Sequence, residues 1–284
     1  MSHPRRSWLF VPGADEKAQA AAARSGADVL IQELEDFTPP PLRAKARALA
    51  RSLYRRWRGA GALAAVRVNP LETCGRDDLD AVLEGKPDIV LMSKVARPEQ
   101  VHALAAIARG VELVPNIESA AGLVRAGEIA RASPRVTALL MASEDMVADL
   151  GTARTRDGEE LAYVRARFLV ECRAAGVEAI DCPYTFSDAK GAEADARVAR
   201  RLGYRMKSLV DPDHASAINR AFSVQPRELA HARRIVQAFD RARAGGRERA
   251  TVEGRLVEVP AYAAAKRLLE RAAHTPAPTR KKRG

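Results

Sequence analysis

The sequence predicts a (β/α)8 TIM barrel, an α/β fold, followed by a C-terminal extension of helices and a hairpin. Eight short apolar or β-rich runs follow one another along the chain, and each leads into an Ala-, Arg- and Leu-rich stretch with a helical pattern. The length of 284 residues suits one such barrel domain. The runs are residues 8–11, 29–31, 65–68, 89–92, 113–116, 138–141, 178–180 and 206–210.

The segments between and after these runs carry the signals of helix ends and turns. Gly176 follows a helical pattern at its carboxyl end, where glycine accepts the left-handed backbone that stops a helix. We expect the barrel to span residues 1–220, an extension that acts as a lid or a subunit-docking segment to span 221–273, and a disordered basic tail to span 274–284. Within the extension we expect helices at 227–243 and 262–271 and a hairpin at 252–260.

The composition is that of a globular protein without a membrane anchor. Hydrophobic residues make up 47% of the chain and charged residues 29%, and no apolar segment approaches membrane-spanning length. The amino terminus lacks the apolar core of a signal peptide. Three cysteines, Cys74, Cys172 and Cys182, form no CxxC pair, which argues against a disulfide framework and a structural zinc site. We therefore expect a cytoplasmic protein.

The net charge of +11 raises the question of a polyanionic partner. Most basic residues are arginines scattered over helical segments, and the one dense basic run, residues 280–283, lies in the tail. Solvated helix faces explain this distribution better than a groove for nucleic acid, so nucleic-acid binding is the least favoured hypothesis and would be confined to the tail. An anionic small molecule such as a coenzyme A ester would be attracted by the same field.

Polar residues end most of the predicted strands, and a barrel gathers all those ends on one face. Carboxylates brought together in this way raise one another's pKa unless a cation compensates them. A divalent metal is the simplest compensation. The residues at the strand ends are Gly13, Glu35, Asp36, Arg67, Asn69, Lys94, Glu118, Glu144, Asp145, Asp181 and Asp211.

The segment from 136 to 151 organises this prediction. Its buried strand, residues 138–141, runs into Ser143, Glu144 and Asp145, and the preceding strand runs in the same way into Glu118. The alternative is that both acids are solvated strand-end charges, but the repetition of the pattern favours metal ligation by Glu118 and Asp145. Oxygen ligands without clustered His or Cys select Mg2+, or Mn2+ as a substitute. No GxGxxG fingerprint, Walker loop or serine nucleophile elbow is present.

Several motifs occur in the order found in a known family. They are RSWLFVPG at 6–13, LED at 34–36, RVN at 67–69, IESA at 117–120, Glu144-Asp145 with DLG at 149–151, and AID at 179–181. Together they resemble the citrate lyase β-subunit-like branch of the HpcH/HpaI aldolase superfamily, which contains malyl-CoA, citramalyl-CoA and related acyl-CoA lyases. The resemblance extends from about residue 6 to residue 271.

The resemblance implies a Mg2+-dependent barrel that cleaves or forms a carbon–carbon bond between a 2-oxo acid and an acetyl or propionyl thioester. The same resemblance assigns roles to residues at the strand ends and to one residue in the extension. In the family the general base often comes from a neighbouring subunit, so we expect a homo-oligomer. The expected metal ligands are Glu118 and Asp145, with Glu35 and Asp36 beside metal-bound waters; Arg67, Ser143 and Glu144 contact substrate, Arg67 as a catalytic group, and Glu258 is the general base.

The sequence departs from the family pattern at three places. Glu33 stands where the family usually has Asp, Ala96 stands where it usually has Glu, and residues 211–214 read DPDH in place of His-Pro-x-Gln. The general base is a fourth departure. Glu258 stands where the family has an aspartate and is longer by one methylene, and near-attack geometry tolerates such displacement poorly. These departures allow a change of substrate from the usual CoA esters, and the sequence leaves open the acyl group, the reaction direction and the choice of coenzyme A or a carrier protein. The alternative is a family member that serves as a non-enzymatic binding or scaffolding subunit.

Overall fold

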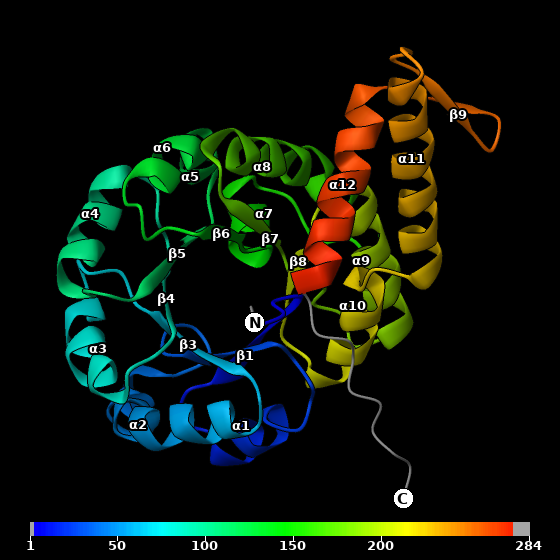
Figure 1. The fold of residues 1–284 in the computed structure, drawn as a ribbon. Coiled ribbons are helices and arrows are strands. Elements are labelled where there is room, and N and C mark those ends of the chain that lie inside the picture. The colour runs from blue at the N-terminus through cyan, green and yellow to red at the C-terminus, as the bar shows by residue number, and fades with distance from the viewer. Residues whose placement is uncertain (1–2, 275–284) are drawn as a thin grey trace, which may run out of the picture. The chain divides into compact units, whose positions relative to one another are not determined.

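The structure, a computed structural model that describes residues 3–274, contains a closed barrel of eight parallel strands (Figure 1). Each strand pairs with the next in sequence, and β1 pairs with β8 to close the ring. Every apolar run named above coincides with one of these strands, so the predicted barrel is confirmed. The strands are β1 (Ser7–Pro12), β2 (Val29–Glu33), β3 (Leu63–Val68), β4 (Ile89–Met92), β5 (Glu112–Ile117), β6 (Ala138–Met141), β7 (Glu178–Asp181) and β8 (Met206–Leu209).

Side chains alternate along each strand between the barrel interior and the surrounding helices. One buried cluster fills the interior, with members such as Ile31, Ala65, Leu91 and Val114. The residues of opposite parity form a second, larger cluster against the helices. This alternation matters for function, because it decides which strand-end residues reach the mouth of the barrel.

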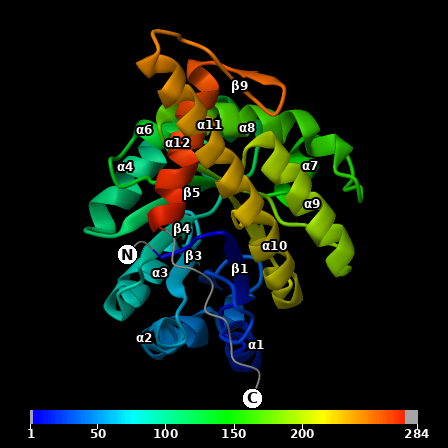
Figure 2. The same cartoon turned by 45° about the vertical axis from the view of Figure 1, so that its right-hand side comes forward.

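Helices and short 3-10 turns connect the strands and surround them (Figure 2). α8 ends where Gly176 adopts a φ of 78°, as the sequence predicts. The helices are α1 (Glu16–Ala22), α2 (Arg43–Gly59), α3 (Gly75–Val82), α4 (Pro98–Ile107), α5 (Ala120–Val124), α6 (Ala126–Arg131), α7 (Glu144–Asp149), α8 (Ala162–Ala175), α9 (Ala189–Leu202) and α10 (Ala215–Phe222), with 3-10 turns η1 (Pro40–Leu42), η2 (Leu83–Gly85), η3 (Glu159–Leu161) and η4 (Pro212–His214).

The chain divides into two compact units, of which one spans Arg5–Phe222 and the other contains the segment that begins at Ser223. This second unit consists of α11 (Pro226–Ala244), the hairpin strands β9 (Ala250–Val252) and β10 (Arg255–Val257), and α12 (Val259–His274). The rings of Phe239 and Tyr262 stack with centroids 4.7 Å apart and join α11 to α12. Nearly all of the predicted basic tail lies outside the described residues. None of the described helices is both long enough and apolar enough to span a bilayer.

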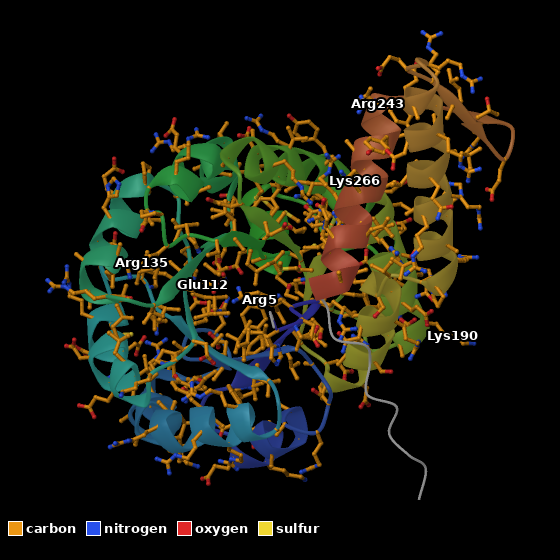
Figure 3. The ribbon with its side chains drawn as sticks, in the orientation of Figure 1. Arg5, Glu112, Arg135, Lys190, Arg243 and Lys266 are labelled. Carbon is orange, nitrogen blue, oxygen red and sulfur yellow. The ribbon has the colours of Figure 1, made fainter. Side chains whose placement is uncertain are left out.

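Charged side chains at the amino-terminal end of the barrel are held by an ion pair and by hydrogen bonds. Arg5 Nη1 lies 2.5 Å from Glu112 Oε1, and the Thr137 hydroxyl donates to the same carboxylate. Arg135 donates to backbone carbonyls of α4 and of the connection between α4 and β5 (Figure 3). These contacts tie the charged side chains to neighbouring structure, so we assign them a structural role.

A second ion network is buried between β7, β8 and the helices α8 and α9. Lys207 Nζ lies 2.6 Å from Asp181 Oδ2 and 2.5 Å from Asp195 Oδ2, and Arg165 contacts both acids at 2.7 and 2.8 Å. Ile180 faces the barrel interior, so its neighbour Asp181 faces the helices instead of the mouth. Two cations and two carboxylates balance one another here, and this strand-end acid is structural.

We expect Lys207→Met to lower the free energy of unfolding by about 3–5 kcal/mol, because it removes one of the two cations and leaves the buried carboxylates of Asp181 and Asp195 to share Arg165 alone. Urea unfolding at neutral pH measures this change. Arg197→Met is the control, since its ion pair with Glu193 lies on the surface of α9 and such pairs contribute about 1 kcal/mol or less. Equal, small losses in the two variants would contradict a structural role for the network.

Candidate metal and substrate site at the barrel mouth

The alternation along the strands brings a set of charged side chains to the mouth of the barrel. Glu33 follows Ile31 by two residues, Arg67 follows Ala65, and Asn116 follows Val114, so each continues an inward-facing series. All three side chains are buried. The carboxyl ends of β2, β3 and β5 therefore deliver polar groups to one place.

Arg67 is the centre of this cluster. Its Nε lies 2.9 Å from Glu33 Oε1, and its Nη2 lies 3.1 Å from Glu35 Oε2 and 3.8 Å from Asp36 Oδ2. Its Nη1 lies 3.6 Å from Glu118 Oε1, and its guanidinium carbon lies 4.9 Å from the ring centroid of Phe10. Burial disfavours the charge of Arg67, but the carboxylates of Glu33, Glu118 and Glu35 outweigh this and raise its pKa. Arg67 thus joins acids from two segments.

Glu33 organises the loop that carries two of the predicted site residues. Besides its contact with Arg67, its carboxylate accepts hydrogen bonds from the backbone N–H groups of Glu35 at 2.7 Å and Phe37 at 2.6 Å. This fully buried side chain fixes both the loop and the guanidinium. The sequence identified it only as a departure from a motif, and its position before Glu35-Asp36 at a strand end was the one available signal.

Glu118 is buried and only partly satisfied. Its Oε1 accepts a hydrogen bond from Asn116 Nδ2 at 3.3 Å, while its buried Oε2 has no hydrogen-bond partner among the described residues. Burial raises the pKa of Glu118 to about 7; Arg67 opposes this rise, and the charges of Glu35 and Asp145 add to it. Asp145 lies in the first turn of α7, directly after β6, and is half-buried. Its charge therefore acts on Glu118 across neighbouring strand ends.

The acidic cluster suits a divalent cation. The four acids that pair with Arg67 and Lys94 outnumber these two cations, and Asp145 adds further negative charge. Among the described residues, no group of three or more His, Cys, Asp or Glu side chains is close enough together to hold a metal ion. Mg2+ is bound in proteins by one or two carboxylates and keeps several waters. Glu118 and Asp145, with the unpartnered Oε2 of Glu118, fit that ion.

The other predicted strand-end residues take different positions. Ser143 is buried, and its hydroxyl has no hydrogen-bond partner among the described residues. Glu144 is exposed and lies 2.8 Å from Thr185 Oγ1 and 3.4 Å from Arg154 Nε, so it contacts the loop after β7. Asp211 caps the 3-10 turn η4, and its side chain accepts a hydrogen bond from the backbone N–H of Asp213. Of these residues, Ser143 alone is left with a donor for a ligand.

Glu258 lies in the C-terminal unit, between β10 and α12. Its side chain is about half exposed and lies 3.4 Å from Arg249 Nε.

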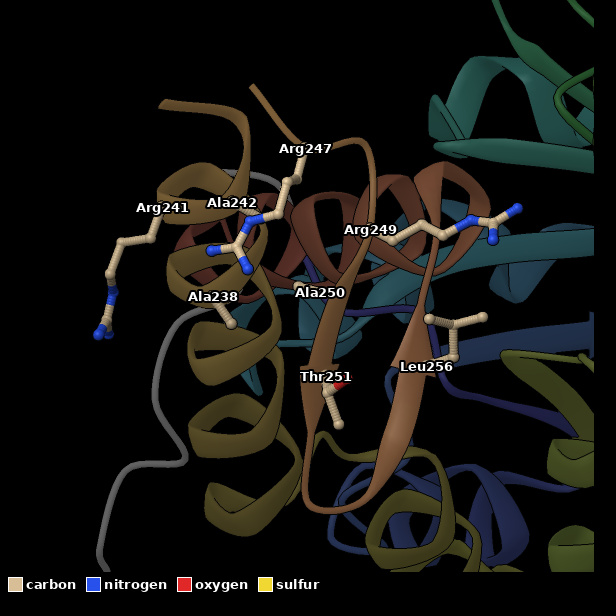
Figure 4. A pocket seen from close by; sticks show the side chains of 8 residues that line it. All are labelled: Ala238, Arg241, Ala242, Arg247, Arg249, Ala250, Thr251 and Leu256. Carbon is tan, nitrogen blue, oxygen red and sulfur yellow. The ribbon is translucent and has the colours of Figure 1, made fainter. Parts of the chain in front are cut away.

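A shallow cavity of about 400 Å3 lies between α11 and the hairpin of the C-terminal unit, and it contains none of the predicted site residues (Figure 4). The residues that line it, three of them arginines, are Ala238, Arg241, Ala242, Arg247, Arg249, Ala250, Thr251 and Leu256.

We expect Glu118→Gln to raise the melting temperature of the metal-free protein at pH 8 by a few degrees. A change of 1 kcal/mol in the free energy of unfolding shifts the melting temperature of a domain of this size by about 2–4 °C. The pKa of Glu118 in the folded protein, about 7, lies above the ordinary value of 4.5, so ionisation of this group costs more in the folded than in the unfolded protein. The free energy of unfolding of the wild type therefore falls as the pH rises from 4.5 to 7. The variant's advantage should therefore grow between pH 5 and pH 8 in thermal melts with a chelator.

Magnesium should reverse the order of the two melting temperatures, so that the wild type becomes more stable than Glu118→Gln. Saturating Mg2+ should raise the melting temperature of the wild type and leave that of Glu118→Gln unchanged, because ligand binding stabilises only the protein that binds it. Glu144→Gln is the control, since this neighbouring acid is exposed and lies outside the cluster. A wild type that gains no stability from Mg2+ would count against the site.

Comparison with known proteins places the chain in a family. The model of the HpcH/HpaI aldolase/citrate lyase family matches residues 6–212. A (3S)-malyl-CoA thioesterase of Cereibacter sphaeroides is 34% identical over 259 residues, 90% of each chain. Citrate lyase subunit beta of Escherichia coli (strain K12) is 32% identical over 286 residues, which cover 94% of this chain and 93% of the relative.

A solved structure has the same fold over nearly the whole chain. The crystal structure of CitE from Mycobacterium tuberculosis in complex with magnesium, acetoacetate and coenzyme A is 29% identical, with a TM-score of 0.77 and coverage of 95% of this chain and 98% of CitE. These matches confirm the resemblance drawn from the motifs. The chain therefore belongs to the HpcH/HpaI aldolase/citrate lyase family and is a lyase.

Proposed function

We propose that this lyase is Mg2+-dependent and cleaves or forms a 2-hydroxyacyl thioester such as malyl-, citramalyl- or citryl-CoA, with a 2-oxo acid and acetyl-CoA as the cleavage products. The observation that carries the proposal is the buried, unpartnered Oε2 of Glu118 in an acidic cluster built around Arg67. The relatives' names agree, since they include a malyl-CoA thioesterase, citrate lyase beta subunits and a CitE complex with magnesium and coenzyme A.

In this proposal Glu118 and Asp145 would hold the cation, and Glu35 and Asp36 would lie beside its waters. When bound, Mg2+ supplies a Lewis acid for the oxygens of the 2-hydroxy or 2-oxo acid, and Mn2+ is a chemically suitable substitute. The Ser143 hydroxyl is a donor for the same acid, because it is buried and has no partner among the described residues. Glu144, which contacts Thr185 and Arg154, would meet substrate only at the edge of the site.

Arg67 stabilises the charge that develops on the thioester. In cleavage a base takes the hydroxyl proton, the carbon–carbon bond breaks as the new carbonyl forms, and the electron pair passes to the thioester as an enolate. The enolate then takes up a proton to give acetyl-CoA. Arg67 keeps its charge throughout. Its Nη1 lies 3.6 Å from Glu118, beyond hydrogen-bond distance, so this donor is available to the enolate oxygen.

Glu258 is the proposed base. It is exposed in the C-terminal unit, and its one ion-pair partner among the described residues is Arg249 at 3.4 Å. We propose that a second copy of the chain supplies this residue, which makes the active enzyme a homo-oligomer. The described cysteines are free thiols, in keeping with the cytoplasmic location that we propose, and the substrates we propose leave no role for nucleic acid.

Hydrolysis of the same thioesters is a second candidate activity. The 34% identity with a malyl-CoA thioesterase over 90% of the chain favours it. The products separate the two reactions, since hydrolysis releases the free thiol of coenzyme A whereas carbon–carbon cleavage releases a 2-oxo acid and leaves the thioester intact. A thiol assay beside a 2-oxo acid assay therefore decides between them.

We expect the wild type with Mg2+ to release a 2-oxo acid from at least one of malyl-, citramalyl- and citryl-CoA. Removal of the metal with a chelator or by Glu118→Ala should reduce kcat/KM by about a hundredfold or more, because a preorganised electrostatic group is lost. Glu112→Ala, at the opposite end of the barrel, is the control. If the wild type binds Mg2+ but converts none of the thioesters, a binding or scaffolding role replaces the lyase activity.

We expect Glu258→Gln to lower kcat by about 10²- to 10⁴-fold with little change in substrate affinity, as the loss of a general base should do. Glu253→Gln in the same hairpin is the matched control, because Glu253 pairs with His231 and Arg234. Steady-state kinetics of the three proteins measure the effect. Equal activity in Glu258→Gln and the control would exclude Glu258 as the base.

A further inference from the structure

Lys94 occupies an unusual backbone conformation at the mouth of the barrel. It follows β4 by two residues and has a φ of 56°, in the left-handed region that non-glycine residues rarely adopt. Two inter-strand hydrogen bonds hold it there. The N–H of Ser93 donates to the carbonyl of Val68 on β3 at 3.2 Å, and the N–H of Val95 donates to the carbonyl of Asn116 on β5 at 3.1 Å. Such imposed strain gathers at functional sites.

The strain redirects the side chain. Val90 and Met92 belong to the cluster that faces the helices, and simple alternation would point Lys94 the same way. Instead, its Nζ lies 2.5 Å from Glu35 Oε1 and 3.9 Å from Asp36 Oδ1. The left-handed residue therefore brings an ammonium group to the acidic cluster.

Lys94 is also the accessible cation of the cluster. In the described part of the chain, Arg67 and Lys94 are the two cations paired with these acids. The side chain of Arg67 is 6% exposed, whereas that of Lys94 is 49% exposed. The ammonium group has three donors, and the contact with Asp36 is too long for a hydrogen bond. At least one donor of Lys94 is thus available to an incoming anion.

We propose that Lys94 is a substrate-binding residue whose ammonium group receives the carboxylate of the acid half of the substrate, the half that leaves as a 2-oxo acid. This inference deepens the proposed function and rests on it. Arg67, enclosed by carboxylates, serves the thioester oxygen, and Lys94 serves the free carboxylate. The two cations then position opposite sides of the bond that breaks.

Three variants test the assignment. Lys94→Asn removes the charge while keeping a residue that tolerates the left-handed backbone, and Lys94→Arg restores the charge. Lys86→Asn is the matched control, because Lys86 precedes β4, is exposed and has a φ of 54°. Calorimetry measures the Kd of pyruvate and of acetyl-CoA at saturating Mg2+, with each variant as the full-length protein. Thiol and 2-oxo acid assays of the wild type run in parallel.

We expect Lys94→Asn to raise the Kd of pyruvate about tenfold or more, because the variant loses one hydrogen bond between charged groups. The Kd of acetyl-CoA should stay unchanged. Lys94→Arg should recover part of the pyruvate affinity, and Lys86→Asn should bind as the wild type does. Three results would overturn the assignment. They are pyruvate binding by Lys94→Asn that equals that of the wild type, an equal loss of affinity for pyruvate and acetyl-CoA, and a wild type that does not bind pyruvate. A wild type that binds pyruvate through Lys94 but cleaves no thioester would overturn the lyase activity alone.

Discussion

The constraint on which the site depends is the concentration of carboxylates at the mouth of a closed barrel. Parallel strands bring their carboxyl ends together, and here those ends carry Glu33, Glu35, Asp36, Glu118 and Asp145. Arg67 holds four of these acids within 4 Å, yet its single charge does not balance them. A buried carboxylate without full compensation is costly. The same imbalance that destabilises the metal-free fold provides the attraction for a divalent cation.

The buried network around Lys207 shows what a balanced arrangement looks like in the same protein. Two cations and two acids satisfy one another between the strands and the helices, and Arg5 pairs with Glu112 at the amino-terminal end of the barrel. The mouth differs because Glu118 keeps an unpartnered oxygen and Lys94 stays half exposed in a strained conformation. The Lys207 network and the Arg5–Glu112 pair therefore stabilise the fold, whereas the barrel mouth keeps polar groups that are available to ligands.

The strands could be predicted because buried parallel strands read as continuous apolar runs, and residues 138–141 and 89–92 coincide with β6 and β4. The convergence of Glu35, Asp36, Arg67 and Glu118 followed from strand ends alone. Side-chain direction did not follow as easily. Asp181 ends a strand like the others, but its parity turns it toward the helices. The hydrogen bonds of Glu33 and the left-handed backbone of Lys94 depend on neighbouring strands, so no local pattern reveals them.

The most direct test of the proposed metal site is the anomalous scattering of Mn2+ in crystals of the wild-type protein. We expect one strong peak within about 2 Å of carboxylate oxygens of both Glu118 and Asp145, with water completing an octahedral shell. A peak bound elsewhere in the chain, or carboxyl groups of these two residues that share no ion, would contradict it.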